Sequence, residues 1–235
     1  MKNVPKDLLY STFFTIRTYE IDRQKKATVT TLVNLMQEAA MQNVIELKVS
    51  LWDLQDAGIS WVLMRKNLQV SRLPNLGETI RIVTHPSGFE RIYTHRDYLV
   101  FDEKDQLIAQ SSSTWLLMNM HKRRVARIPE AIREKGQFDT SGCLPRAKAK
   151  LATLTVVDCE KAFEVQWHDL DFNEHLNNVR YMQWLFETVD YYVQHKGALV
   201  SMDILYKAEC AWKEVVVVQT QALSEGNYLH RLMRQ

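Results

Sequence analysis

Three polar side chains suited to acid–base chemistry stand at alternate positions in the second half of the chain. They are Asp171, Asn173 and His175, and an amphipathic segment follows them. Alternate residues of an extended segment point to the same side, so these side chains would converge on one bound group. Asn and Asp also close turns and cap helices. The spacing therefore leaves two interpretations open: a catalytic group, or a turn that leads into a helix.

The overall composition is that of an ordinary globular protein. The length of 235 residues suffices for one large domain or two small ones. The residues are 46% hydrophobic and 25% charged, as in most globular proteins. A net charge of +2 argues against nucleic-acid binding through bulk charge. No run of about 18 apolar residues could span a membrane, and residues 1–10 lack the apolar core of a signal peptide. We therefore expect a cytoplasmic protein without a membrane span.

The sequence shows no motif for a metal or a nucleotide cofactor. Cys143, Cys159 and Cys210 lack paired C-x-x-C spacing, so we expect free thiols and no metal site. Neither G-x-G-x-x-G nor G-x-x-x-x-G-K occurs, and the chain has only seven glycines, too few for a glycine-rich phosphate loop. We therefore expect no cofactor.

The first half predicts one strand, a long helix and four further strands. Thr28 is a typical N-cap, and apolar residues follow it at three-to-four spacing up to about Leu47. Alternating apolar residues between turn sequences predict strands over residues 11–21, 59–73, 78–84, 91–101 and 107–118. One long helix with a largely antiparallel sheet is an α+β architecture. A sheet wrapped around a central helix is the hotdog arrangement, which we expect here.

The pattern restarts after a stretch of different composition. Residues 129–150 mix Gly, Ser, Pro and charged residues without periodicity, which is typical of a domain linker. Beyond it we expect a helix from the cap Asn177 to about His195, and strands over residues 163–167, 201–210, 214–222 and 228–234. The chain then divides into a hotdog at 1–130, a linker at 131–152 and a second hotdog at 153–235. Either the last strand of the second hotdog lies outside this sequence or its sheet is one strand short.

The two halves look like copies of one unit. A shift of 149 residues lays residues 20–22 on 169–171 and Thr28 on Asn177. The apolar positions of the two predicted helices then coincide as well, which indicates an internal repeat.

The repeat locates the expected chemistry. Under the same shift, Gln24 stands in place of Asn173 and Lys26 in place of His175. Because the first copy lacks the polar trio, only the second copy is expected to be catalytic.

Several motifs support a resemblance to a known family. The most specific is D-x-N-x-H-x-N-N-V over residues 171–179, with support from residues 16–21, 35–38, 115–119, 124–130, 201–202 and 209–210. With these motifs the sequence resembles the acyl-acyl-carrier-protein thioesterases of fatty-acid synthesis, the plastid Fat type and its bacterial relatives, over nearly its whole length. The resemblance implies a tandem hotdog that hydrolyses the thioester of a fatty acyl chain on acyl carrier protein and releases the fatty acid.

The resemblance also implies a catalytic set of Asp171, Asn173, His175 and Glu209, with Cys210 as nucleophile in an older view of the family. If residues 201–210 form a regular strand, Glu209 and Cys210 point to opposite faces and cannot both face the site. Cys210 would lie on the more apolar face, where a free cysteine packs as a small hydrophobe. We therefore favour Glu209.

Attack by water is the mechanism that these residue types favour. Asp171 and Glu209 are candidate bases, because neighbouring carboxylates tend to have separated pKa values. His175 would orient the water or protonate the leaving thiolate, and Asn173 would hold the carbonyl or the water. The first amides of the following helix would stabilise the oxyanion.

Two further sets of residues follow from the resemblance. The acyl chain is expected between helix and sheet of the first hotdog, where the candidates are Leu32, Leu35, Met36, Trp61, Leu63 and Met64. Because acyl carrier protein is acidic, a basic docking face is expected. Two basic clusters are candidates: Lys122, Arg123, Arg124 and Arg127, and Arg146, Lys148 and Lys150.

Three other functions are compatible with the same fold. An acyl-CoA thioesterase would use the same chemistry, and its basic residues would bind CoA phosphates. A non-catalytic acyl-binding module would not need Asp171, Asn173 and His175. A hotdog dehydratase would draw its His and its acidic residue from different subunits. A homodimer is a further expectation, although the two halves already pair as a pseudo-dimer.

Overall fold

The structure is a computed structural model that describes residues 3–136, 138–147, 149–190, 193–194, 197–224 and 226–235. The chain forms two compact units, and both are discontinuous in sequence. The first unit combines Met1–Ala147 with Leu199–Tyr206, and the second combines Lys148–Ala198 with Lys207–Gln235. Residues 199–206, which we placed in the second hotdog, therefore group with the first unit.

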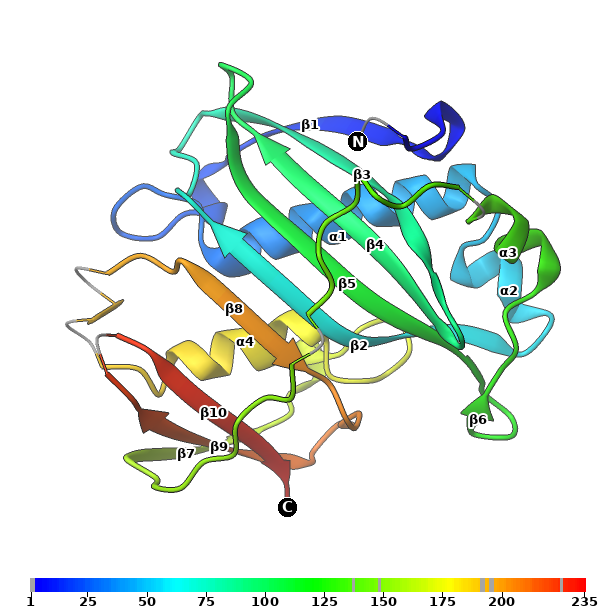
Figure 1. The fold of residues 1–235 in the computed structure, drawn as a ribbon. Helices are drawn as coiled ribbons and strands as arrows, with labels where there is room; N and C mark the ends of the chain where they lie inside the picture. Colours follow the sequence, from blue (N-terminus) through cyan, green and yellow to red (C-terminus); the bar gives the residue numbers. More distant parts are fainter. Residues whose placement is uncertain (1–2, 137, 148, 191–192, 195–196, 225) are drawn as a thin grey trace. The chain divides into compact units, whose positions relative to one another are not determined.

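The first unit is a long helix against an antiparallel sheet, which confirms the predicted hotdog architecture (Figure 1). The strand order is β1-β3-β4-β5-β2-β8, and β6 pairs with β5. Its elements are β1 (Tyr10–Thr15), α1 (Val29–Glu46), α2 (Leu51–Gln55), β2 (Ile59–Val70), β3 (Thr79–Glu90), β4 (Tyr93–Phe101), β5 (Leu107–Asn119), β6 (Arg124–Val125), α3 (Glu130–Lys135) and β8 (Ser201–Leu205). Strand β1 ends earlier than predicted because a turn of 3₁₀-helix, Thr18–Glu20, follows it.

Helix α1 begins where the sequence predicted. The Thr28 hydroxyl accepts a hydrogen bond from the Thr31 amide at 3.0 Å, which satisfies one of the free amides of the first turn. Its buried face includes Leu32, Met36 and Ala39, each with 0% of its surface exposed. The spacing of these residues places them on one side of the helix, so burial of that side holds α1 on the sheet.

Strand β2 contains a bulge that redirects its side chains. Leu63 pairs with Trp115, but Arg65 pairs with Thr114, so Met64 is the extra residue. In a regular strand Arg65 would follow Leu63 on the same face. Because of the bulge, Lys66 takes that face instead, and the side-chain order beyond it is inverted.

Strand β8 joins the first sheet at its β2 edge. It pairs antiparallel with residues 65–69 of β2. Arg65 also donates two hydrogen bonds to Asp203, at 2.8 and 2.6 Å, a bidentate ion pair that fixes the register. These contacts explain why residues 199–206 group with the first unit.

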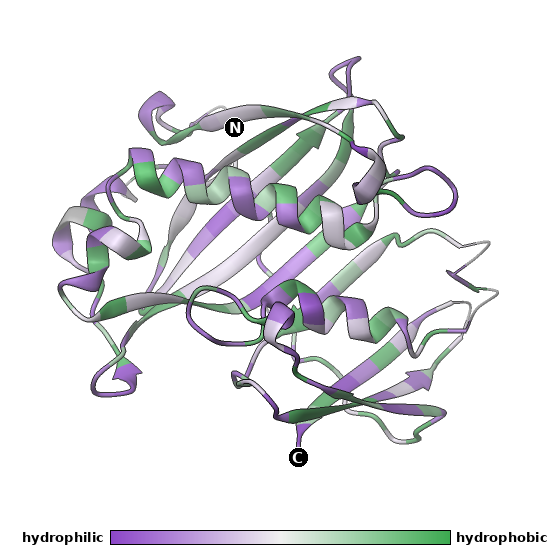
Figure 2. Cartoon of the chain, turned by 180° about the vertical axis from the view of Figure 1, so that it is seen from behind, coloured by the Kyte–Doolittle hydropathy of each residue, from purple (hydrophilic) through white to green (hydrophobic). Residues whose placement is uncertain are grey.

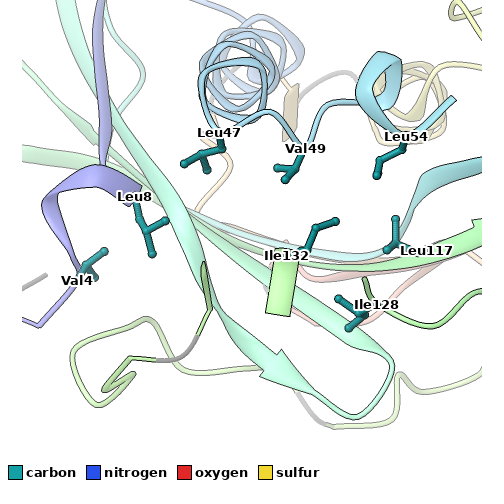
Figure 3. Close-up of a cluster of buried hydrophobic side chains, with 8 residues drawn as sticks. All are labelled: Val4, Leu8, Leu47, Val49, Leu54, Leu117, Ile128 and Ile132. Atoms are coloured by element: carbon teal, nitrogen blue, oxygen red, sulfur yellow. The ribbon is translucent and has the colours of Figure 1, made fainter. Parts of the chain in front are cut away.

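A hydrophobic cluster packs at one end of the first unit (Figure 3). Trp61 lies against this cluster and donates a hydrogen bond to the Val49 carbonyl at 2.9 Å. Figure 3 shows side chains from the N-terminal segment, α2, β5, α3 and the loops that precede α2 and α3. They are Val4, Leu8, Leu47, Val49, Leu54, Leu117, Ile128 and Ile132. The cluster ties the start of the chain to α2 and α3.

The predicted linker is partly fastened to the first sheet. Arg146 pairs with the buried Asp97 at 2.7 Å, and the Leu144 amide donates to the same carboxylate at 2.7 Å. The Ser87 hydroxyl donates to Asp97 as well, at 2.8 Å. A buried carboxylate needs such partners, so these contacts hold residues 144–146 on the sheet.

The second unit repeats the plan with fewer strands. Its three-stranded antiparallel sheet has the order β10-β9-β7, and the unit contains the helix α4. The elements are β7 (Cys159–Glu164), α4 (Asn178–Phe186), β9 (Val215–Ala222) and β10 (Tyr228–Arg234). Residues on one side of α4, Val179, Met182 and Leu185, are buried, as are Val216 and Val218 of β9. In the part of the chain that the structure describes, no helix is long and apolar enough to cross a membrane.

Helix α4 ends earlier than predicted. We expected it to reach about His195, which lies outside the described residues, but its last residue is Phe186. The amide and hydroxyl of Thr188 both donate to the Leu185 carbonyl, at 3.1 and 2.7 Å. This side-chain bond competes with helix continuation. Residues 193–194 are helical again, so the single helix that we predicted is interrupted after Phe186.

Candidate active site

Asp171, Asn173 and His175 lie in a tight loop, not in an extended segment. The Asp171 amide donates to the His175 carbonyl at 2.8 Å, and its carboxylate accepts from the Asn173 and His175 amides at 2.8 and 3.3 Å. Glu174 adopts a left-handed conformation with φ 61°. The expected alternation on one side of a strand is therefore wrong, because Asp171 folds the backbone around its own side chain.

The elements on both sides hold this loop in place. Residues Trp167–Asp169 form a turn of 3₁₀-helix before it, and Asn177 caps α4 after it by accepting from the Val179 amide at 2.9 Å. Arg180 of α4 reaches back to Asp169, with its Nε 3.3 Å from Oδ1. The loop is thus fixed at its entry and at its exit, as a reactive group requires.

A second segment brings Glu209 to His175. Residues His175 and Ala211 form a β-bridge, and the Leu176 amide donates to the Cys210 carbonyl at 2.7 Å. The Glu209 Oε2 then lies 3.6 Å from the His175 Nε2. The side chains are 33% and 26% exposed, so water can reach both. Two of the predicted catalytic residues therefore form a carboxylate–imidazole pair.

The side-chain carboxamide of Asn173 is the third polar group of the loop. Its side chain is half-buried and makes no hydrogen bond to any residue that the structure describes. A carboxamide offers one acceptor and two donors without titrating, so Asn173 is free to bind a ligand oxygen.

Cys210 is a poor nucleophile in this setting. Residues 206–210 are irregular. The expected strand over residues 201–210 is therefore wrong beyond Leu205. Cys210 is nevertheless buried whereas Glu209 is half-exposed. Burial raises the pKa of the Cys210 thiol, although a hydrogen bond with Tyr181 opposes the shift.

The first unit contains the same loop with a different set of side chains. The Asp22 carboxylate accepts from the Gln24 and Lys26 amides at 2.8 and 3.1 Å, and Lys25 has φ 61°. Residues Ile21 and Ala27 form a β-bridge, as Leu170 and Leu176 do in the second unit. The loop geometry confirms the predicted repeat.

The position of Glu209 also has a counterpart in the first unit. Lys26 forms a β-bridge with Asn75, as His175 does with Ala211. Two residues before Asn75 stands Leu73, where the second unit has Glu209. The aspartate is therefore common to both loops and builds the turn. The imidazole, its carboxylate partner and the asparagine occur only in the second.

The helix amides offer less to an oxyanion than expected. The Val179 amide donates to the Asn177 side chain, and the Arg180 amide donates to the Asn177 carbonyl at 2.8 Å. Both are therefore occupied before any substrate binds. Within the described ranges, no group of three His, Cys, Asp or Glu side chains could hold a metal ion.

The remaining predicted residues fall into distinct environments. Of the acyl-chain candidates, Leu32, Met36 and Leu63 are buried, and Leu35, Trp61 and Met64 are half-buried. Of the docking candidates, five are exposed: Lys122, Arg123, Arg124, Arg127 and Lys150. Arg146 is only 17% exposed and is paired with Asp97, so its charge is already neutralised. Lys148 lies outside the described residues.

Aromatic side chains beside the site were missed by the sequence reasoning. Trp167, Phe172 and Trp212 are 67%, 63% and 54% exposed, and they stand on the segments that carry His175 and Glu209. Exposed apolar side chains indicate a binding surface when they are grouped, whereas single ones are ordinary. Their concentration around the D-x-N-x-H motif was the available signal.

Comparisons with known proteins show the family to which the two halves are similar. Residues 7–135 match the family model of the acyl-ACP thioesterase N-terminal domain, and residues 154–234 match that of the acyl-ACP thioesterase C-terminal domain. A chloroplastic palmitoyl-acyl carrier protein thioesterase from Cuphea hookeriana is 28% identical over 226 residues, which cover 91% of this chain and 54% of that protein. The chain thus spans about half the length of the curated relatives it matches.

Solved structures show the same fold. A 12:0-ACP thioesterase from Umbellularia californica superposes with a TM-score of 0.87 at 23% identity, covering 97% of this chain and 92% of that one. An acyl-ACP thioesterase from Bacteroides thetaiotaomicron gives 0.88 at 17% identity, with 97% and 93% covered.

Proposed function

Because the chain belongs to the acyl-acyl-carrier-protein thioesterase family, we propose that it hydrolyses the thioester between a fatty acyl chain and acyl carrier protein. The observation that carries the proposal is the pair formed by His175 and Glu209, 3.6 Å apart, in the second unit. The first unit has the same loop without this pair. Hydrolysis needs a base and an acid beside the carbonyl, and a purely structural loop does not.

The proposed reaction proceeds through attack by water. Glu209 accepts a proton as the water oxygen bonds to the carbonyl carbon, and Asn173 donates a hydrogen bond to the developing oxyanion. The carbon–sulfur bond then breaks, and His175 gives its proton to the leaving thiolate. Transfer of the proton from Glu209 to His175 restores the pair. The products are a free fatty acid and the thiol of the carrier.

Asp171 takes a positioning role in this scheme. One oxygen of its carboxylate is already engaged by two loop amides, and Asp22 makes the same two bonds in the first unit. Glu209 is therefore the better base. Of the two candidate bases that the sequence suggested, Asp171 and Glu209, the proposal therefore retains Glu209.

The acyl chain and the carrier would use other parts of the protein. The apolar side chains of Leu32 on α1 and of Leu63 and Trp61 on β2 support the predicted acyl-chain pocket. The exposed Lys122, Arg123, Arg124 and Arg127 offer positive charge to an acidic carrier. In a carrier titration, charge reversal at Arg124 should raise KM, whereas Lys104→Glu, in an exposed turn of the same unit, should leave it unchanged.

Release of thiol from purified acyl carrier protein charged with a fatty acid tests the proposal directly. The wild-type protein and His168→Ala, an exposed histidine near the loop, should both release thiol, and Glu209→Gln should not. Acyl-CoA of equal chain length belongs in a parallel reaction. Faster turnover of acyl-CoA would favour the alternative carrier, and no thiol release from either would reject the enzyme activity.

Two finer expectations accompany the proposal. We infer a cytoplasmic site of action and a homodimer, and both stay predictions. Fractionation of cells that express the protein would test the first, and sedimentation equilibrium the second.

A further inference from the structure

The helix-facing side of the first sheet carries charge where an alkyl chain would be expected. The β2 bulge places Lys66 on the same face as Trp61 and Leu63. Lys66 pairs with Ser113 of β5, and Ser113 pairs with Arg96 of β4, so the three side chains share one face at one level of the sheet. Figure 2 shows hydrophilic stretches in the strands that run behind α1.

Lys66 is buried without a polar partner. It is 3% exposed, and among the residues that the structure describes its Nζ makes no hydrogen bond or ion pair. The Nζ lies 4.3 Å from the centre of the Tyr98 ring. A cation–π contact offsets only part of the cost of removing an ammonium group from water. The group is therefore left with unused capacity to donate hydrogen bonds.

Arg96 is a second buried cation on this face. Its Nη1 donates to the Asn43 side chain of α1 at 2.7 Å and to the Thr84 hydroxyl at 3.1 Å, both of them neutral groups. The neighbouring Asp97 points to the opposite face, where Ser87, Leu144 and Arg146 engage it. Within the described part of the chain, neither Lys66 nor Arg96 forms an ion pair with a carboxylate.

Both cations lie close to Tyr98. The Lys66 Nζ lies over the Tyr98 ring. The Arg96 Nη1 donates to Thr84, the residue that pairs with Tyr98. The strands that carry the two cations are separated by β5 alone, a span of about 10 Å between backbones. The Lys66 side chain extends over part of this span, and Tyr98 stands two residues from Arg96 on the same face of β4. The residues of β5 between them, Ser111 and Ser113, are small. An oxygen ligand held there would meet both charges.

Burial has left Lys66 unusually responsive to such a ligand. It lowers the pKa of Lys66 to about 7, and it lowers the pKa of Arg96 from its ordinary value. An anion beside Lys66 would reverse the shift and restore the full charge. Binding would therefore gain both a charge-assisted hydrogen bond and relief of the buried amine.

We propose that this face binds a carboxylate carried on the acyl chain, so that the preferred substrates are ω-carboxyacyl thioesters. The inference rests on the proposed function, which identifies the ligand as a fatty acyl chain. Trp61 and Leu63, the apolar residues on the same face as Lys66, would contact the methylene groups. Lys66 and Arg96 would bind the terminal carboxylate. A plain alkyl chain would leave Lys66 without a partner, and a phosphate on the polar carrier arm would not match the apolar flank.

Calorimetric binding tests the inference without need of catalysis. The probes are dodecanedioic acid monomethyl ester and methyl dodecanoate, which differ only in the carboxylate. We expect the wild-type protein to bind the acid ester more tightly. In Lys66→Met that affinity should fall by about tenfold or more and the affinity for methyl dodecanoate should rise. Lys104→Met, an exposed lysine in a turn of the same unit, should bind both as the wild-type protein does.

Two controls keep the outcome decisive. Lys66→Gln, a polar substitution of similar length, guards against misfolding, and thermal unfolding should show both Lys66 variants at least as stable as the wild type. Equal affinity for the two esters in the wild-type protein would overturn the inference, as would displacement of the acid ester by 4′-phosphopantetheine. Thiol-release assays on the two matching acyl-carrier-protein thioesters separate the hypotheses. Lys66-dependent binding without turnover would reject only the enzyme activity, and turnover without discrimination would reject only the carboxylate site.

Discussion

The loops at residues 22–28 and 171–177 have one backbone and two sets of side chains. Each is closed by an aspartate that accepts two loop amides, and each contains one left-handed residue. A helix cap follows in both, Thr28 in one and Asn177 in the other. The two units differ in three side chains: Gln24, Lys26 and Leu73 occupy the positions that Asn173, His175 and Glu209 occupy in the second unit. The aspartate therefore stabilises the loop in both units, and the other three positions determine which chemical groups each unit offers.

The most damaging change should be to give the second loop the residues of the first. His175→Lys and Glu209→Leu each remove one acid–base role, which is worth about 10²–10⁴ in rate. The turn depends on Asp171, so the thermal unfolding temperature should change little. Steady-state hydrolysis and a thermal scan of both variants measure the two effects. A variant that keeps more than a tenth of the wild-type kcat would break the assignment.

The aspartates provide the next test. Asp22→Ala and Asp171→Ala should each lower the free energy of unfolding by about 1–2 kcal/mol, because two loop amides lose their acceptor. Only Asp171→Ala should also lower kcat, since His175 then loses its support. Chemical denaturation and kinetics on the two variants make the comparison. Equal loss of kcat in both would show that the loops are not functionally distinct.

Cys210→Ser should have a small effect. Burial raises the pKa of the Cys210 thiol, so the thiolate is scarce at neutral pH. We expect kcat within about threefold of the wild type, at a cost of about 1–3 kcal/mol in stability if the buried hydroxyl lacks a partner. The pH–rate profile should keep its shape. A loss as large as that of Glu209→Leu would restore the thiol mechanism.

The smallest effect is expected from the reverse graft. Lys26→His combined with Leu73→Glu should place a carboxylate beside an imidazole in the first unit. A neighbouring negative charge raises the pKa of an imidazole. NMR titration should therefore give the introduced histidine a higher pKa in the double variant than in Lys26→His alone. No gain in hydrolysis is expected, because the graft supplies neither Asn173 nor a carbonyl site.

Local signals in the sequence were sufficient for the helix starts and the repeat. Thr28 and Asn177 stand at cap positions ahead of apolar periodicity, and a cap acts within one turn. The sequence predicted Asp171 as a catalytic base, although Asp22 matches it under the shift. The structural role of this aspartate became clear only when both were seen to bind loop amides.

Other features depended on contacts between distant residues. The bulge at Met64 arises from pairing with β5, and it decides that Lys66 rather than Arg65 faces α1. Strict alternation could not reveal this. The early end of α4 likewise depends on the Thr188 side chain, which apolar spacing does not register. Backbone pairing between distant strands and single side-chain hydrogen bonds therefore limited the prediction more than composition did.

The pairing of β8 with β2 also constrains how the protein folds. Arg65 and Asp203 are 138 residues apart in sequence, and their ion pair closes a very long loop. Contacts of such separation form slowly, so the segment that carries Glu209, three residues beyond Tyr206, should be ordered late. A fragment that begins after residue 147 would contain β8 without its partner strand. It would then present an unpaired edge on which a second chain could add.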